Sequence, residues 1–345
     1  MAKVIPTADG IPVVNLANSA PHHPTEAETK PLETAHDAVG PAPSRWWLRA
    51  SAAWWRGLQT IGMTLHFIPA ERPPSPSFTK TIPSTISKSK GEFTLQFYTP
   101  KGYNKAAKTG EEYPALVNFH GGGFFLGNAT DDARFARFVL DKCNAVFVSV
   151  DYRLSPENPF PVAVEDAADA LLYLIRNRAR PPHRPLQNWQ YLASQRAATS
   201  PSRRPCVWPT ISGNSGLQAS MSPNIAFTLP DNLTSLFDAS YLHPPDLKLA
   251  TPYLSPTKAT DEQLAEALPE TVIFYTCEWD MLLQEGEELA KRLKRAPISR
   301  DVRYKMIKGV PHAWDKSPDP TKPAEFSEDL YRECCEHLRE VFEKP

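Results

Sequence analysis

The residues with the clearest chemical potential form the short run His-Gly-Gly-Gly-Phe at 120–124. This run follows an apolar segment, 115–119, that is typical of a buried strand. Where a strand ends in a tight glycine turn, backbone N–H groups point into a cleft and stabilise negative charge that develops on a carbonyl oxygen. The run therefore indicates an oxyanion hole for acyl-transfer chemistry, with Gly121, Gly122 and Gly123 as donors. Glycine turns after strands are also common without this chemistry, so the run alone leaves both interpretations open.

Strand-like and helix-like segments alternate through most of the chain. Besides 115–119, apolar or alternating runs predict strands at 92–98, 145–150, 271–275 and 302–307. Amphipathic periodicity predicts helices at 131–143, 162–175, 284–294 and 327–342, the last with Ser327 as its N-cap. Because strands that alternate with helices build a mainly parallel sheet covered on both faces, the pattern predicts an α/β domain over residues 79–345.

Two segments precede this domain. Residues 1–43 are rich in Pro, Ala, Thr and His without periodicity, which indicates a disordered leader. In residues 44–78, tryptophans and aliphatic residues recur at roughly helical spacing, with three arginines between them. Such a helix either packs on its own domain as a cap or lies on a membrane surface, and packing on the domain is the favoured interpretation.

Composition limits the partners and the compartment. The net charge of the 345-residue chain is −1, so no bulk field favours nucleic acid. Five cysteines at irregular spacing match neither a disulfide framework nor a zinc pattern, so we expect a cytoplasmic protein without a metal. The N-terminus is polar and no run reaches the length of a membrane span, which leaves peripheral contact through residues 44–68 as the expected membrane association.

Four signatures occur in order along the chain: His-Gly-Gly-Gly-Phe at 120–124, Asp-Tyr-Arg-Leu-Ser-Pro-Glu at 151–157, Asp-Met-Leu-Leu-Gln-Glu-Gly at 280–286 and Gly-Val-Pro-His at 309–312. In combination they resemble the hormone-sensitive-lipase-like branch of the α/β hydrolases, including its fungal esterase and steryl acetyl hydrolase-like members. The resemblance implies an α/β-hydrolase fold with an N-terminal helical cap. It also implies a serine esterase that acts on small or medium acyl esters through an acyl-enzyme, without a metal or an organic cofactor.

The resemblance assigns roles residue by residue. It gives the three glycines the oxyanion hole, Asp280 the role of triad acid and His312 the role of general base. The chemistry agrees, because a base must reach the nucleophile from a loop while an acid holds its other ring nitrogen. Without this context, Asp280 would be a strand-end cap and His312 a surface histidine. Asp151 and Arg153 correspond to structural positions, and we expect them to form an ion pair.

The nucleophile of this family stands in a G-x-S-x-G turn between a strand and a helix. The nearest string here is Gly-Asn-Ser-Gly-Leu at 213–217, where Leu217 replaces the glycine that close packing at the turn requires. Ser215 also lies too far from His120, since the family spacing places the serine near residue 195. Ser215 and Ser194 are therefore only weak candidates for the nucleophile.

The region around residue 195 has a second interpretation. Residues 176–224 lack periodicity, and a long structureless insert inside a compact α/β domain is unusual. The codons of Trp189–Pro201 can be read in a shifted frame, in which each new codon consists of the third base of one codon and the first two bases of the next. The bases that these residues require permit the string Ala-Ile-Ser-Gly-Phe-Ser-Ala-Gly-Gly-Asn-Leu-Ala in that frame. That string is the family's nucleophile turn. We therefore predict that the chain is translated in the wrong frame from after Ile175 to about Thr210, through a mispredicted intron or a true frameshift.

An alternative follows if the chain is translated as written. It would then be a catalytically inactive α/β-hydrolase-like protein that lacks the nucleophile turn, although its oxyanion loop could still bind ligands. A central strand and the helix after it would also lose their apolar character. Since the net stability of a domain is only about 5–15 kcal/mol, such a chain should be poorly soluble or only partly folded.

Overall fold

The computed structural model describes residues 4–6, 12–14, 34–36, 41, 43–67, 72–103, 113–177, 186–191, 231–249, 251–254, 256–280, 282–316 and 324–343. The chain divides into two units, Met1–Leu32 and Glu33–Pro345. In the first unit, β1 (Val4–Pro6) pairs antiparallel with β2 (Pro12–Val14). Most of the leader predicted over residues 1–43 lies outside the described residues. All that follows concerns the second unit.

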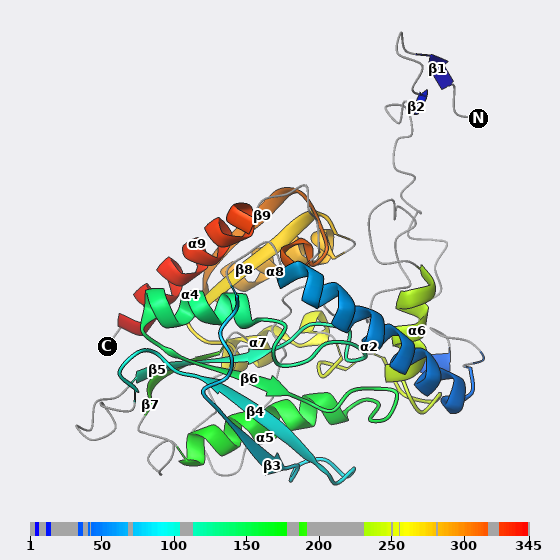
Figure 1. Cartoon of the computed structure of the whole chain (residues 1–345), viewed down its shortest axis with the longest axis horizontal. Coiled ribbons are helices and arrows are strands. Elements are labelled where there is room, and N and C mark those ends of the chain that lie inside the picture. Colours follow the sequence, from blue (N-terminus) through cyan, green and yellow to red (C-terminus); the bar gives the residue numbers. More distant parts are fainter. Residues whose placement is uncertain are drawn as a thin grey trace. The chain divides into compact units, whose positions relative to one another are not determined.

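Five strands form the main sheet of the second unit, in the order β3-β4-β6-β5-β7 (Figure 1). They are β3 (Phe78–Pro83), β4 (Glu92–Tyr98), β6 (Val146–Asp151), β5 (Tyr113–Phe119) and β7 (Leu186–Tyr191). The first two pairings are antiparallel, whereas β6, β5 and β7 run parallel. The apolar runs of β5 and β6 are almost entirely buried, as expected of strands covered on both faces.

A second, two-stranded parallel sheet consists of β8 (Thr271–Trp279) and β9 (Asp301–Pro311). Its register pairs Thr271 with Asp301 and, beyond a bulge, Trp279 with Pro311. The apolar side chains of β8 are mostly half-buried, unlike those of β5 and β6. Among the described strands, none pairs with β8 on the side away from β9.

Helices cover both faces of the main sheet (Figure 1). On one face, α4 (Ala133–Cys143) and α9 (Ala324–Glu343) share a core with Leu116 and Phe147 of the sheet. On the other face, α5 (Val162–Asn177) packs on Val117 and Val148. Consecutive strand residues thus face opposite helical layers, as the period of two requires. Helix α9 also contacts β8, whose other face packs with α7 (Asp261–Ala267) and α8 (Leu283–Lys294).

The helix predicted within residues 44–68 is α2 (Arg45–Phe67). It lies beside α6 (Asp231–Tyr241), and the two helices share a small apolar core in which Leu48 and Ala52 pack with Leu236 and Phe237 (Figure 1). Among the described helices, none is long and apolar enough to cross a membrane.

Most of the predicted elements are present, and two differ. Ser327 is not the N-cap of the last helix, because α9 begins at Ala324 and includes Ser327 in its first turn. Within residues 176–224, for which we predicted no regular structure, Leu186–Tyr191 forms β7 beside β5. The rest of that segment after Tyr191 lies outside the described residues.

Candidate active site

The loop after β5 has the backbone conformation that its glycines allow. Gly122 and Gly123 have φ angles of 119° and 60°, in the region where residues with a Cβ are strained. A Cβ on Gly122 would lie 2.2 Å from the carbonyl oxygen of Leu126, and one on Gly123 would lie 2.5 Å from the ring of Phe237. The Gly122 carbonyl accepts the N–H groups of Phe125 and Leu126 at 3.1 and 2.8 Å. The loop is therefore a tight, closely packed turn, as the sequence predicted.

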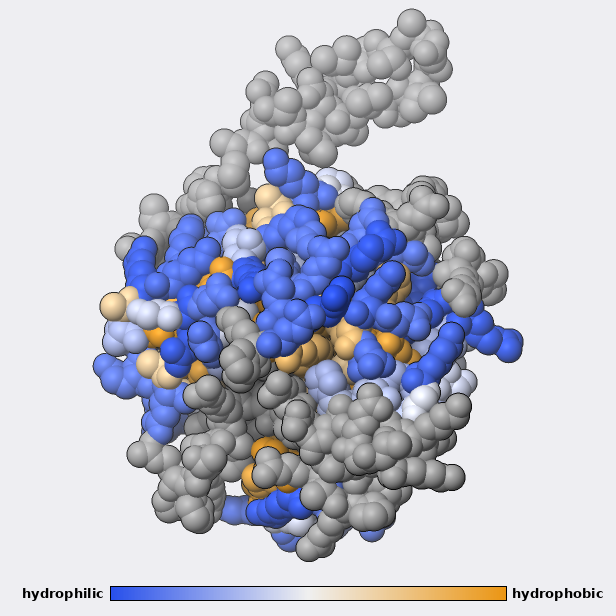
Figure 2. Space-filling model, turned by 90° about the vertical axis from the view of Figure 1, so that its left-hand side faces the viewer, coloured by the Kyte–Doolittle hydropathy of each residue, from blue (hydrophilic) through white to orange (hydrophobic). Residues whose placement is uncertain are grey.

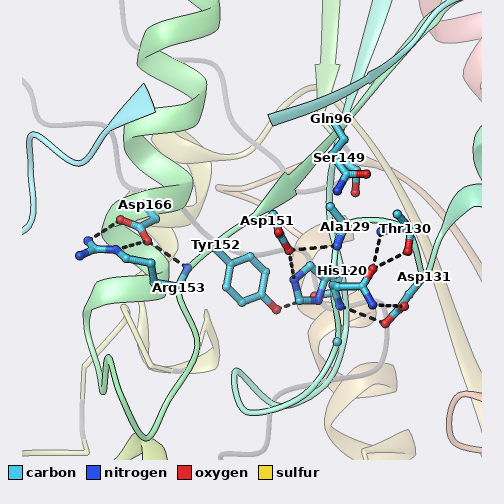
Figure 3. Close-up of polar contacts among 12 residues, drawn as sticks. Gln96, His120, Ala129, Thr130, Asp131, Ser149, Asp151, Tyr152, Arg153 and Asp166 are labelled. Atoms are coloured by element: carbon cyan, nitrogen blue, oxygen red, sulfur yellow. Dashed lines mark hydrogen bonds and ion pairs between the residues drawn. The ribbon is translucent and has the colours of Figure 1, made fainter. Parts of the chain in front are cut away.

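His120 anchors the start of this loop (Figure 3). Its ring is buried and stacks on Tyr152, with the ring centroids 4.3 Å apart. The Tyr152 hydroxyl donates to the His120 carbonyl at 2.6 Å, and His120 Nδ1 lies 2.8 Å from the Gly121 carbonyl oxygen. Burial lowers the pKa of His120, more than its hydrogen bond to Gly121 and nearby carboxylates raise it. The ring is thus neutral, and its contacts with Tyr152 and Gly121 hold the first residues of the loop in place.

The expected ion pair between Asp151 and Arg153 is wrong (Figure 3). Arg153 instead makes a two-pronged contact with the buried Asp166 of α5, with Nε and Nη2 at 2.9 and 2.7 Å from the two carboxylate oxygens. Asp151 accepts the Ala129 N–H at 3.2 Å and lies 4.0 Å from His120 Nε2. The reason is that β6 ends at Asp151, so the two side chains do not stay on one face of a strand.

Asp280 and His312 lie together at the ends of the second sheet. Each follows directly after one member of the registered pair Trp279 and Pro311, so the parallel strands deliver both side chains to the same edge. His312 Nδ1 lies 2.9 Å from Asp280 Oδ2, and the two side chains are only 9% and 7% exposed. The other carboxylate oxygen accepts the Leu282 N–H at 2.9 Å. The aspartate thus fixes the orientation of the His312 ring through Nδ1, and Nε2 is the ring nitrogen on the other side.

A series of polar contacts connects the segment after His312 with the strand that leads into the glycine loop. Lys316, in the short 3-10 helix η2 (Trp314–Lys316) after His312, has its Nζ 2.6 Å from Asp132 Oδ1. The other Asp132 oxygen accepts the Asn118 amide at 3.0 Å, and Asn118 lies in β5 two residues before His120. The segment after His312 and the strand that leads into the glycine loop are therefore both bound to Asp132.

Helix α2 holds the far side of the glycine loop through two residues that sequence reasoning did not identify. The Gln59 amide accepts the Gly127 N–H at 2.8 Å and donates to Asp131 at 2.8 Å. Arg56 donates to the carbonyls of Phe125 at 3.0 Å and Ser155 at 2.7 Å. Their spacing of three places both side chains on one face of the helix, but the sequence does not indicate which segment that face contacts.

The two weak nucleophile candidates, Ser194 and Ser215, both lie outside the described residues. The strand that precedes them, β7, is described. Its last residue, Tyr191, pairs with Val117 of β5, the strand that leads into the glycine loop. In the sequence, the shifted-frame string Gly-Phe-Ser-Ala-Gly begins at residue 192, directly after that strand ends.

Comparison with known proteins gives a family. The family described as alpha/beta hydrolase fold matches residues 116–198 and 193–316, which together span more than half of the chain. The two matched segments meet at 193–198, where the sequence predicts the lost nucleophile turn.

Curated relatives match a large part of the chain at low identity. An AB hydrolase superfamily protein of Schizosaccharomyces pombe is 27% identical over 67% of this chain and 71% of its own length. The carboxylic ester hydrolase LipN of Mycobacterium tuberculosis is 28% identical over 62% of this chain and 59% of its own length.

Solved structures agree at the level of the fold. A thermostable esterase from Pseudomonas putida superposes with a TM-score of 0.63 at 19% identity, covering 89% of this chain and 99% of the esterase. This likeness shows that the two chains share a fold. On the family match and this shared fold, the chain belongs to the alpha/beta hydrolase fold family.

Proposed function

We propose that the native product of this chain is a carboxylic ester hydrolase that cleaves small or medium acyl esters through an acyl-enzyme. The observation that carries the proposal is the buried hydrogen bond of 2.9 Å between His312 Nδ1 and Asp280 Oδ2. It stands at the ends of two registered parallel strands, in a family whose relatives include a protein named as a carboxylic ester hydrolase.

The proposed reaction assigns each group a step. A serine hydroxyl attacks the ester carbonyl while His312 Nε2 takes its proton, and Asp280 stabilises the imidazolium that forms. The backbone N–H groups at Gly121, Gly122 and Gly123 stabilise the oxyanion. His312 then protonates the leaving alcohol, and water activated by the same ring releases the acid. The reaction so written uses no metal or organic cofactor.

The missing serine is supplied in this proposal by the restored reading frame. Two observations support that choice. A nucleophile turn of this kind follows a strand and begins a helix, and β7 ends one residue before the shifted string begins. That strand lies parallel and adjacent to β5, so a turn at its end would lie next to the glycine loop.

We further propose that the partner is a small ester rather than nucleic acid and that the protein acts in the cytoplasm. The near-zero net charge, the irregular spacing of the cysteines and the free state of the four cysteines within the described residues support these choices. The inactive alternative, a ligand-binding protein without the nucleophile, is less favoured because curated relatives include named ester hydrolases.

The test begins with the transcript across codons 176–224. If it spells Gly-Phe-Ser-Ala-Gly-Gly in frame, the encoded protein should hydrolyse p-nitrophenyl butyrate, and a fluorophosphonate should label that serine by mass spectrometry. Asp280→Asn should lower kcat by roughly 10³–10⁴-fold, the effect of losing the ring's orientation. Glu278→Gln is the matched control, because Glu278 is an exposed carboxylate two residues away that only accepts the Gly309 N–H. A transcript identical to the chain as written, with no turnover, would overturn the proposal.

A further inference from the structure

We propose that the outward face of α2 docks on an anionic lipid bilayer, so that the enzyme takes its ester from the membrane interface. The inference rests on the proposed function for the identity of the substrate. The docking itself rests on the exposure, charge and contacts of this helix.

The helix exposes a continuous apolar face. Its exposed large side chains are Trp46 at 75%, Trp47 at 47%, Trp54 at 66%, Leu58 at 41%, Ile61 at 60% and Leu65 at 53%. At about 100° per residue these positions fall within roughly a third of the helix circumference. Single exposed apolar residues are ordinary, whereas six on one helix face form a patch of the kind that marks an interaction site.

The face does not cover the helix's own domain. Packing against that domain uses the opposite side of α2, where Leu48 and Ala52 are completely buried against α6. Arg56 and Gln59 point from the same inner side to the glycine loop. The contacts that hold the helix on its domain therefore come from the inner side and not from the exposed apolar face.

Charge and side-chain chemistry select the partner. Helix α2 contains three arginines and no acidic residue, although the whole chain has a net charge of −1. Among its arginines, Arg49 is exposed while Arg45 and Arg56 reach back to the domain. Tryptophans on a basic helix suit the headgroup level of an anionic bilayer, where the ring is half apolar and half wet.

Other surfaces of the molecule contrast with this helix. In Figure 2, which shows the side of α9, the coloured part of the surface is mainly hydrophilic, with apolar residues in small patches. Since no described helix meets the requirement for spanning a bilayer, α2 would lie in the interface plane with its outer face in the lipid.

The same helix connects the lipid to the reaction. Gln59 accepts the N–H of Gly127 at 2.8 Å, and a Cβ on Gly127 would lie 2.3 Å from the carbonyl oxygen of Gly121. A bilayer that fixes α2 therefore fixes a helix that is in direct contact with the oxyanion loop. We expect the rate of hydrolysis of an ester dissolved in vesicles to exceed the rate of hydrolysis of a soluble ester.

The experiment uses the full-length product of the sequenced transcript and flotation with two kinds of vesicle, pure phosphatidylcholine and phosphatidylcholine with 30 mol% phosphatidylserine. The protein should float with the anionic vesicles, and the variant Trp46→Ser, Trp54→Ser, Ile61→Ser should bind at least tenfold more weakly. Arg49→Glu should weaken binding to the anionic vesicles more than to the neutral ones. Tyr253→Ser is the control, because Tyr253 is 46% exposed outside this helix and its loss should change nothing.

Hydrolysis of p-nitrophenyl butyrate without vesicles separates the two proposals. The triple variant should keep this activity, because its three residues are 60–75% exposed, whereas Arg56 and Gln59 on the other side of the helix make the contacts with the glycine loop. An enzyme that is active on the soluble ester but binds neither vesicle overturns the docking proposal alone. So does equal vesicle binding by the triple variant. The oligomeric state in sedimentation tests a second occupant. If the parent protein and the control variant are dimers while the triple variant is a monomer, the face binds a second copy of the chain instead.

Discussion

Lys316 Nζ lies 2.6 Å from Asp132 Oδ1, and Asp132 in turn accepts the amide of Asn118 in β5, the strand that leads into the glycine loop. Burial acts to raise the pKa of Asp132, but the charge and hydrogen bond of Lys316 and the Asn118 amide together hold it below its usual value. Burial likewise opposes the charge on Lys316, and Asp132 and Asp315 nevertheless raise its pKa. Both groups are therefore charged at neutral pH and depend on each other.

Lys316→Ala should accordingly destabilise the protein strongly. Removing one member of a largely buried ion pair leaves the other charge uncompensated, which typically costs about 3–5 kcal/mol. The measurement is the free energy of unfolding in urea. Lys305→Ala is the matched control, because Lys305 pairs with Glu333 on a more exposed surface where such pairs contribute about 0–1 kcal/mol. Equal losses in the two variants would contradict the structural role of the Lys316–Asp132 pair.

Gly123→Ala should disable the oxyanion loop. The new Cβ would lie 2.5 Å from the Phe237 ring at a φ of 60°, so either the loop or α6 must move. Because the loss of one oxyanion donor costs roughly 10²–10³-fold in kcat, we expect at least that reduction on p-nitrophenyl butyrate. Gly102→Ala is the control: its φ is 91°, and the nearest atom to its Cβ is 4.0 Å away. This control should lose stability through backbone strain alone and keep its turnover.

These sites differ in how far the sequence could predict them. The Asp280–His312 pair was predictable from the family signatures that contain the two residues, and the parallel register of β8 and β9 explains why they lie at one edge. The partner of Arg153 was not, since it depends on where β6 ends and on the buried position of Asp166 in α5. The contacts of Arg56 and Gln59 with the glycine loop join segments about 70 residues apart, and no local pattern specifies such docking.

Asp238 gives the structure a pH dependence that does not involve Asp280 or His312. Burial in α6 raises the pKa of Asp238 to about 8, well above its value in the unfolded chain. Between pH 4 and 8 the folded state therefore holds a proton that the unfolded state has released. The free energy of unfolding should fall as the pH rises through this range, by an amount on the order of a few kcal/mol.

Asp238→Asn tests this directly, because the amide is neutral at every pH. Urea unfolding at pH 5 and pH 8.5 should show a smaller loss of stability in the variant than in the parent protein. The variant should also be the more stable of the two at pH 8.5. Identical pH profiles for the two proteins would mean that the Asp238 carboxyl is not held neutral by burial.

The half-buried side chains of β8 predict how the chain translated as written should unfold. Ile273 and Phe274 belong to a continuous apolar run, which in a parallel sheet is normally buried, yet both are only partly covered. The adjoining sheet edge has no described strand on the side away from β9. The chain as written should therefore expose apolar surface, bind 8-anilinonaphthalene-1-sulfonate and unfold over a broad range of urea. The product with the restored frame should unfold in one steep transition without dye binding, since its restored strand and helix would regain the apolar residues that pack into the core. A sharp, cooperative transition of the chain as written would contradict this expectation.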